Sequence, residues 1–399
     1  MREIVVIGCG LAGYHAARRI EQRIAGRRRV RLTVINERAD FVFSPLLTAV
    51  ASGELLPGHI TVGLSDVFES YTRVIVDRVE RIDVDAGEVV TTQESLGFDY
   101  LVIATGTAPS ATTFTGAGEL IGPHSLKDAV EIRDRLDALE ADGSGDARFA
   151  VVGASTTGVE WAARLASRAA DGSGLNRTEV ELYEVESRVL PDHSAQLADK
   201  VETLLEQLGV RVYTDCRIDS ATVSQVVPEG EAGRDATMVF HCAGRVGTSP
   251  ITTSGLPVDS TGRVEVNDQL GVVGNIGVYA AGDAIRGPST APSNTNPQIA
   301  RQQGIRAARN LIAAMSGRTQ EPFEYDDRGD FVMLGPGDTI LQLGGMQLEG
   351  KAAWLAHRLF YTALMPQSLS KLRLLVDWVG RSAGSATSVG ANRRLPDDS

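Results

Sequence analysis

The sequence predicts an α/β fold in which one supersecondary unit occurs twice and is followed by a different C-terminal segment. The first copy lies at residues 2–38, and the second begins about 145 residues later, which marks an internal repeat. Each copy combines a short β-branched strand, a glycine-rich turn, a helical pattern and a second strand ending near an acidic residue. The 399 residues exceed what one hydrophobic core usually serves, so several domains are expected.

The first copy has the spacing of a Rossmann-like dinucleotide-binding unit. A strand at residues 4–7 runs directly into a GxGxxG turn, which precedes a helix at 14–24 and a strand at 31–35. Gly8 allows the tight turn, Gly10 lets a pyrophosphate approach the backbone, and Gly13 lets the helix pack on the strand. The N–H groups at the start of the helix attract phosphates. An acid after the second strand accepts a hydrogen bond from a ribose hydroxyl, and here Asn36-Glu37 occupies that place.

The segment that follows returns the chain to the same sheet. Residues 40–47 are expected to be an extended segment held by Pro45, either lying under a flat ring or packing in the core. Short strands are expected at 73–77 and 79–84. A buried strand at 98–106 ends in Ala-Thr-Gly, and such an ending brings the chain back to the ligand side of the sheet.

The second copy departs from the pattern at one glycine. After a helix at 126–139 and a flexible link at 142–146, it has a strand at 148–152, a turn at 153–158, a helix at 159–170 and a strand at 180–183. Ser155 replaces the middle glycine, which is the position that lets a pyrophosphate approach. Glu184 ends the second strand and would repel a ribose 2′-phosphate. The copy therefore indicates either a second dinucleotide site or a structural relic.

The chain then continues through this unit and returns to the first. A helix is expected at 195–208, with strands at 210–213 and 238–245. Residues 263–270 and 277–284 bring the chain back, and Asp283, after a strand ending in Ala-Gly, can face a ribityl or phosphate group.

A helix from 294 to 315 has Pro297 in its first turn. Gln298 and Gln302 are four residues apart and share one face of this helix. Two amides on one helical face can bind a carbonyl-bearing ring, or they can simply cap and solvate the helix.

The C-terminal part has a different character. Strands at 331–334 and 339–343 lead to an amphipathic helix at 351–365, then to a second apolar stretch at 369–379. Aromatic residues alternate there with cations, as expected of helices that lie in a membrane surface. A dimer interface, or a helix packed on the core, remains the alternative. Residues 381–399 have the composition of a disordered tail.

The composition excludes several classes of protein. The net charge of −12 argues against a nucleic-acid partner. The three cysteines form no CxxC pair, and the six histidines show no metal-ligand spacing, so neither a dithiol centre nor a metal site is expected. The N-terminus enters a strand directly, so no signal peptide is expected. No apolar run reaches the about 18–20 residues that span a bilayer. A cytoplasmic or surface-bound protein follows.

Taken together, the chain resembles the type II NADH dehydrogenases (NADH:quinone oxidoreductases) of the two-dinucleotide flavoprotein superfamily. The resemblance covers residues 3–380 and rests on the stretches 8–13, 43–47, 99–106, 158–160, 281–283 and 298–303. It implies FAD in the first unit and NADH in the second. The FAD-binding domain would be 1–112 with 251–323, the NADH-binding domain 113–250, and the membrane-anchoring or dimerisation segment 324–380.

The resemblance also assigns roles to residues. Glu160 would lie between nicotinamide and flavin, and Gln298 and Gln302 would line the quinone pocket; these three are the expected catalytic residues. The expected cofactor-binding residues are Gly8, Gly10, Leu11, Ala12, Gly13, Asn36, Glu37, Pro45, Leu46, Val79, Ala104, Thr105, Gly106, Gly153, Ser155, Gly158, Glu184, Gly244 and Asp283. Asn36 stands where the family has an acid, and Pro297 stands where it has alanine.

The implied activity is hydride transfer from NADH to FAD and then two-electron reduction of a membrane quinone, without proton pumping. The protein would be a peripheral homodimer on the cytoplasmic side of the cell membrane. Two alternatives stay open. One is a flavin-binding regulatory or assembly protein with a weakened NADH site, supported by Ser155. The other is a different FAD/NAD(P)H reductase, such as a sulfide:quinone or ferredoxin reductase.

Overall fold

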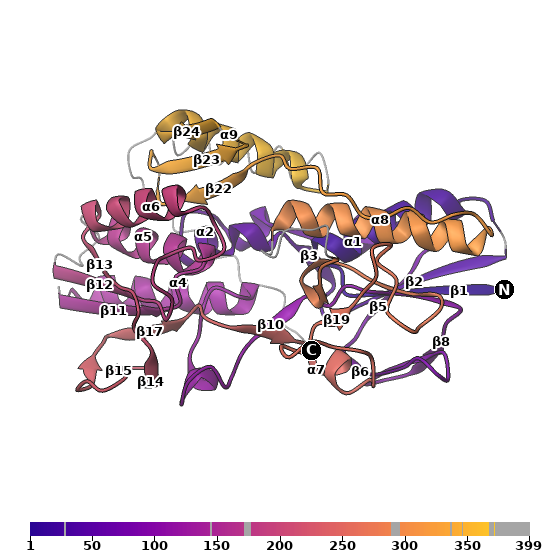
Figure 1. Ribbon diagram of the computed structural model, residues 1–399, viewed down its shortest axis with the longest axis horizontal. Coiled ribbons are helices and arrows are strands. Elements are labelled where there is room, and N and C mark those ends of the chain that lie inside the picture. Colours follow the sequence, from indigo (N-terminus) through magenta and orange to yellow (C-terminus); the bar gives the residue numbers. More distant parts are fainter. Residues whose placement is uncertain are drawn as a thin grey trace.

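A computed structural model shows an elongated molecule in which two parallel sheets lie side by side along the long axis (Figure 1). The N-terminal sheet occupies one end, the second sheet the other, and the C-terminal segment forms the top of the view. The structure describes residues 1–27, 29–143, 146–170, 177–288, 296–335, 337–344, 346–366 and 371.

The first sheet is parallel and contains one strand from far along the chain. Its order is β20-β9-β1-β2-β5, formed by β1 (Arg2–Ile7), β2 (Val30–Asn36), β5 (Arg73–Val76), β9 (Tyr100–Ile103) and β20 (Val278–Ala280). Ile4 pairs with Leu32 on one side and Tyr100 on the other. The central strands are buried on both faces, as expected of a parallel sheet with continuous apolar strands. Residues 278–280 therefore belong to the first unit.

Two helices, α1 (Leu11–Ile24) and α8 (Pro297–Met315), pack against each other and on this sheet. Their approach is unusually close at Gly304, where a Cβ atom would lie 2.1 Å from the carbonyl oxygen of Ala12. The expected start of the first helix at Tyr14 was three residues late, because Gly10 is the extended N-cap and residues 11–13 are already helical. Residues 294–295, where α8 was expected to open, lie outside the described ones; Asn296 caps the helix, and Pro297 stands in its first turn as predicted.

The segment after β2 corrects one prediction. Only β3 (Asp40–Val42) is extended, and the chain turns helical in η1 (Ser44–Leu46) and α2 (Leu47–Ala51). Pro45 sits in the first turn of η1, where a fixed φ and a missing N–H cost nothing. The rest of this unit consists of η2 (Pro57–His59), β4 (Thr61–Gly63), α3 (Leu64–Val67), β6 (Val79–Asp83), β7 (Glu88–Thr91), β8 (Ser95–Gly97), α7 (Ser249–Thr252), β19 (Val264–Glu265), η4 (Gly282–Ala284) and β21 (Ile285–Arg286).

The second sheet repeats the parallel arrangement in the order β13-β12-β11-β17. Its strands are β11 (Asp146–Val152), β12 (Arg177–Tyr183), β13 (Val210–Tyr213) and β17 (Met238–His241), accompanied by α4 (Leu126–Asp142), α5 (Thr156–Ala170) and α6 (Ala195–Gln207). Helix α5 begins at Thr156 and not at Val159, for the same reason as α1. The predicted link at 142–146 is largely replaced by the ends of α4 and β11, and its residues 144–145 lie outside the described ones.

Smaller elements complete the two units. The ribbon of β10 (Thr107–Pro109) and β18 (Arg245–Gly247) connects the sheets, because the chain leaves the first unit along β10 and returns along β18. The second unit also contains η3 (Ala117–Glu119) and an antiparallel sheet of β14 (Ile218–Thr222), β15 (Gln225–Pro228) and β16 (Arg234–Asp235).

The C-terminal segment is a three-stranded antiparallel sheet with one helix. It contains β22 (Asp330–Met333), β23 (Thr339–Leu343), β24 (Met346–Glu349) and α9 (Gly350–Leu364), of which β24 was not expected. The predicted apolar stretch at 369–379 and the tail at 381–399 lie outside the described residues, apart from residue 371. None of the helices that the structure describes is long and apolar enough to cross a bilayer.

Candidate functional site

The first glycine-rich turn lies at the carboxyl ends of β1 and β9. Gly8 has φ +87°, and a Cβ there would lie 2.4 Å from the carbonyl oxygen of Ala104. A Cβ on Gly13 would lie 1.9 Å from the carbonyl oxygen of Gly8. Gly10, by contrast, faces open space. Two glycines thus allow the turn to close, and the third leaves room beside the backbone.

The start of α1 fits the diphosphate of a dinucleotide. Leu11, Ala12 and Gly13 are buried, and none of the described side chains caps this end of the helix. The first N–H groups of a helix have no partner within it, so a buried, uncapped start requires an external acceptor. A diphosphate supplies acceptors and negative charge where the helix dipole favours them. The residues present therefore fit FAD at this end of the sheet.

In both copies, the side chain at the end of the second strand accepts a hydrogen bond from the glycine-rich turn. Asn36 accepts the N–H of Cys9 on Oδ1 at 2.9 Å. Glu184 takes the same place in the second copy, accepting the N–H of Ala154 at 2.6 Å and that of Glu186 at 3.0 Å. Glu37 is exposed. Asn36 and Glu184 therefore stabilise their turns, and ribose binding by these residues and by Glu37 stays a prediction.

Ser155 is compatible with the fold of the second turn. A Cβ at Gly158 would lie 1.8 Å from the carbonyl oxygen of Gly153, so this turn closes as tightly as the first. Ser155 is exposed, and its hydroxyl donates to the carbonyl oxygen of Cys242 at 3.4 Å. Its side chain therefore lies at the surface of the turn and does not distort the helix start. Gly244, which follows β17, has φ +64° and lies against Thr113.

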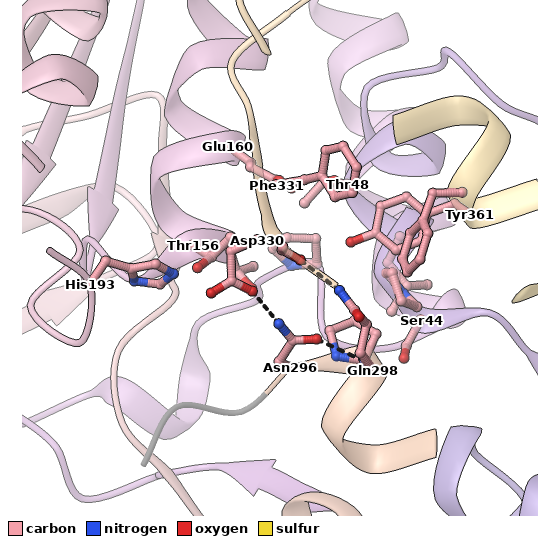
Figure 2. Close-up of a pocket in the computed structure, with 17 residues that line it drawn as sticks. Ser44, Thr48, Thr156, Glu160, His193, Asn296, Gln298, Asp330, Phe331 and Tyr361 are labelled. Carbon is pink, nitrogen blue, oxygen red and sulfur yellow. Dashed lines mark hydrogen bonds between the residues drawn. The ribbon is translucent and has the colours of Figure 1, made fainter. Parts of the chain in front are cut away.

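A cavity of about 160 Å³ lies where the two units and the C-terminal segment meet (Figure 2). Pockets for drug-sized ligands have volumes of about 300–1,000 Å³. This cavity is smaller, so it has room for a ring system and not for a dinucleotide. Its polar lining includes Thr48, Glu160, Gln298, Asp330 and Tyr361; the remaining lining residues are Ser44, Pro45, Leu47, Pro123, Thr156, Thr157, His193, Asn296, Pro297, Gly329, Phe331 and Phe360.

Glu160 projects from α5 into this cavity. Its Oε1 accepts the N–H of Met333 at 3.2 Å, and Thr48 hydrogen-bonds its side chain. Burial raises the pKa of Glu160 to about 8, and the two hydrogen bonds oppose this shift only in part. The carboxyl is therefore mainly protonated at neutral pH and holds a proton beside the cavity.

The two predicted glutamines of α8 differ in their surroundings. Gln298 is 4% exposed and lines the cavity, and its Nε2 donates to the carbonyl oxygen of Gly329 at 2.6 Å. Gln302 lies outside the lining, and its amide exchanges two hydrogen bonds with the backbone of Asp326, at 2.8 and 2.9 Å. The structure therefore brings Pro45, Glu160 and Gln298 together and leaves Gln302 apart.

The remaining predicted residues surround the first unit. Ala104, Thr105 and Gly106 follow β9, and the Thr105 hydroxyl accepts a hydrogen bond from that of Thr248 at 2.9 Å. Burial raises the pKa of Asp283, against the opposing effect of Arg245 and Arg263. Leu46 is buried at the end of η1, and Val79 is buried in β6. The roles of all these residues in cofactor binding stay predictions.

Several residues at this site had little or no signal in the sequence. Thr48, Asn296, Asp330 and Tyr361 line the cavity from four separate segments. Arg245 was not singled out either, although its guanidinium donates to the Thr107 hydroxyl and carbonyl, both at 2.7 Å. Asn296 alone had a local signal, because an asparagine before a proline at the start of a helical pattern is typical of an N-cap.

Comparison with known proteins identifies the class. Residues 2–304 match the family model "Pyridine nucleotide-disulphide oxidoreductase", and the chain belongs to this family. Among curated proteins, it is 28% identical over 397 residues to demethylphylloquinone reductase NdbB of Synechocystis, covering 96% of both chains. It is 28% identical over 414 residues to the type II NADH:quinone oxidoreductase Ndh of Mycobacterium tuberculosis, covering 94% of this chain and 87% of that protein.

Solved structures show the same fold. NDH2 of Plasmodium falciparum in complex with NADH has a TM-score of 0.82 at 16% identity, covering 96% of this chain and 98% of that one. The sulfide:quinone oxidoreductase of Aquifex aeolicus has a TM-score of 0.78 at 19% identity, covering 96% and 93%. The predicted fold class and the predicted resemblance to type II NADH dehydrogenases are confirmed.

Proposed function

We propose that the chain is an FAD-dependent NADH:quinone oxidoreductase. The observation that carries the proposal is the cavity itself, where Pro45 and Gln298 of the first unit meet Glu160 of the second. A protein that passes electrons from a nucleotide on one unit to an acceptor at another must bring the two units together at one small site. Relatives named NADH:quinone oxidoreductases match 94–96% of the chain, which supports the same reading.

The proposed domains follow the predicted boundaries. Residues 1–112 and 251–323 would bind FAD through the turn at 8–13, the loop at 45–46, the strand end at 104–106 and Asp283. Residues 113–250 would bind NADH through Gly153, Ser155, Gly158, Glu184 and Gly244. FAD, when bound, supplies the chemistry that accepts a hydride and gives two electrons to a quinone.

The chain's own residues orient the reactants, exclude water and supply a proton. Thr48 and the Met333 N–H fix the Glu160 carboxyl, and burial keeps it protonated at neutral pH. A reduced quinone needs two protons, and Glu160 can deliver one to a ring oxygen in the cavity. Half-buried aromatic side chains on the lining, those of Phe331, Phe360 and Tyr361, restrict access of bulk water.

The alternative of a sulfide:quinone reductase lacks a suitable thiol. Among the described residues, Cys9 and Cys242 are buried, and burial raises the pKa of both, that of Cys242 to about 12. Neither lines the cavity, and Cys216 does not line it either. A thiol that stays protonated is a poor nucleophile, so these cysteines offer no route for sulfide chemistry.

We infer that the protein binds a membrane surface from the cytoplasmic side through its C-terminal segment. Helix α9 exposes Leu355 and Leu359, each 54% exposed, and β24 exposes Met346 at 71%. The Arg358 guanidinium carbon lies 3.4 Å from the centre of the Trp354 ring on the same helix. Exposed leucines beside a tryptophan and a cation suit the interface of a bilayer. A homodimer formed through this face is the competing arrangement.

The function is tested anaerobically with the purified holoenzyme. NADH is expected to bleach the flavin band near ~450 nm within seconds, and a soluble quinone is expected to restore it. If the protein binds FAD but NADH does not bleach the flavin band, the proposal is overturned and a flavin-binding regulatory protein is favoured. Sulfide bleaching without NADH bleaching would favour the sulfide:quinone reductase.

A further inference from the structure

The amide of Gln298 is held in one orientation. Its Nε2 donates to the carbonyl oxygen of Gly329 at 2.6 Å, and its main-chain N–H donates to Oδ1 of Asn296 at 2.7 Å. Because a carbonyl oxygen only accepts, the contact with Gly329 requires the nitrogen of the amide on that side. Oε1 is then the free end, and it is buried with no hydrogen-bond partner among the described residues.

Asn296 and Asp330 fix this arrangement from outside. Asn296 is the N-cap of α8, and its Oδ1 accepts the Gln298 N–H. Its Nδ2 donates to Oδ1 of Asp330, the first residue of β22 (Figure 2). Gly329, the acceptor of the Gln298 amide, immediately precedes Asp330. One short segment of the C-terminal sheet therefore holds both the start of α8 and the side chain of Gln298.

The unpartnered oxygen indicates the chemistry of its ligand. A buried acceptor without a donor costs free energy, so this position calls for a ligand that donates a hydrogen bond. The carbonyl oxygens of an oxidised quinone only accept, whereas the hydroxyl groups of its two-electron-reduced form donate. Glu160, on the same cavity, is the complementary group, because its neutral carboxyl can donate to a ring oxygen.

We propose that Asn296 and Asp330 are positioning residues, which orient the buried Gln298 amide oxygen as the acceptor for a ring hydroxyl of a ligand bound in the cavity. The cavity then binds the hydroquinone form of the electron acceptor more tightly than the quinone form. This inference rests on the proposed quinone reduction. It also gives Asn296 and Asp330 a function beyond capping of α8, namely the orientation of the Gln298 side chain.

The test compares binding of menadiol and menadione to the holoenzyme, with the flavin oxidised and no NADH, by equilibrium dialysis under argon. The wild-type protein is expected to bind menadiol more tightly. In Asn296→Asp the new carboxylate still accepts the Gln298 N–H. It can no longer donate to Asp330, so the two carboxylates repel each other. The Kd for menadiol is expected to rise about fivefold to tenfold, as for one lost hydrogen bond. The Kd for menadione is expected to change less than about twofold.

Rescue separates positioning from a general loss of structure. The double variant Asn296→Asp/Asp330→Asn reverses donor and acceptor, so menadiol affinity is expected to return. Gln298→Leu is expected to remove the preference for menadiol, and adding Asn296→Asp to it is expected to have no further effect. Arg306→Ala is the control, because it removes a different side-chain hydrogen bond of α8. That bond, from Arg306 to Glu321, lies away from the cavity.

Three results would overturn the proposal: equal affinity of the wild type for both forms, an equal loss of both ligands in Asn296→Asp, or no rescue in a double variant with an unchanged thermal midpoint. Failure of NADH to bleach the flavin is a separate result, since it overturns the proposed function and is measured without either ring compound.

Discussion

Glu160 combines an unusual protonation state with a position at the centre of the molecule. Burial raises its pKa to about 8, so the carboxyl is protonated at pH 7 and ionises as the pH rises through 8. We predict that Glu160→Gln slows reoxidation of the reduced flavin by quinone about 100-fold, because an amide cannot deliver a proton. Reduction by NADH is expected to change much less, and stopped-flow absorbance measures both steps.

The pH profile checks the same assignment. In the wild type the rate of quinone-dependent reoxidation is expected to fall above pH 8, and the profile of Glu160→Gln is expected to be flat there. A wild-type rate that stays constant from pH 6 to 10 would show that Glu160 is not the proton donor.

The raised pKa of Glu160 also makes stability depend on pH. The folded protein holds this proton up to about pH 8, whereas the unfolded chain releases it near the ordinary glutamate pKa of 4.5. Between these values the folded state binds more protons, so stability falls as pH rises, by at most about 1.4 kcal/mol per pH unit. We predict that Glu160→Gln has a higher free energy of unfolding than the wild type at pH 8.5. The difference between the two proteins is expected to be smaller at pH 5, and urea unfolding measures it at both pH values.

Helix α5 carries a buried cation one turn after Glu160. The Arg164 side chain is 1% exposed, and its guanidinium pairs with Glu54 and contacts Sδ of Met333 at 3.5 Å. Burial lowers the pKa of Arg164 to about 10. This side chain links the second unit to the loop after α2 and to the C-terminal sheet. It therefore holds together three segments that lie far apart in the sequence.

We predict that Glu54→Ala destabilises the protein by about 3 kcal/mol, because it leaves a buried charge without its partner. The double variant Glu54→Ala/Arg164→Met is expected to recover most of this loss, since a methionine fills the space without a charge. Chemical denaturation of the two variants measures the difference. Equal stabilities would show that the ion pair contributes little.

The contact between α1 and α8 leaves no room for a side chain at Gly304. We predict that Gly304→Ala destabilises the protein by about 2 kcal/mol, because the new methyl group would push the helices apart. The intrinsic gain of alanine over glycine in a helix, about 1 kcal/mol, does not offset this. Gly58→Ala is the matched control, since no atom lies within 4 Å of the added Cβ. Thermal unfolding compares the two variants.

The sequence predicted the elements well where periodicity and glycine spacing determine them locally. The strands at 4–7 and 148–152, both turns and the long helices lie where their patterns indicated. The starts of α1 and α5 were placed three residues late, since each glycine turn is already helical after its third residue, Gly10 or Ser155. Residues 44–47, the second half of the segment predicted to be extended, are helical instead, because one proline suits a strand edge and a helix start equally.

At the scale of the whole molecule, the cavity could be predicted only in part. Glu160 and Gln298 belong to motifs with a recognisable spacing, whereas Asp330 and Tyr361 reach the cavity through the packing of the C-terminal sheet and α9. No local pattern reports such long-range packing. Gln302 shows the reverse case, because helical spacing places it near Gln298, but hydrogen bonds to Asp326 hold its amide away from the cavity.

We predict that the exposed face of α9 binds membranes. Leu355→Ser/Leu359→Ser is expected to reduce binding to anionic vesicles at least about tenfold in a sedimentation assay, since two buried leucines contribute about 3 kcal/mol or more. Reduction of a soluble quinone is expected to be unchanged. A variant that binds vesicles normally but becomes a monomer would indicate that this face is instead the dimer interface.

The ribbon of β10 and β18 carries the chain both out of the first unit and back into it. Pro109 pairs with Arg245 across this ribbon, so the two crossing points are about 5 Å apart. The main chain therefore joins everything between them, from residue 110 to residue 244, to the first unit at this one place. The first unit thus needs only a tight reverse turn there to be a continuous chain. Strand β20 and helix α8 would then follow β9 within one continuous first unit.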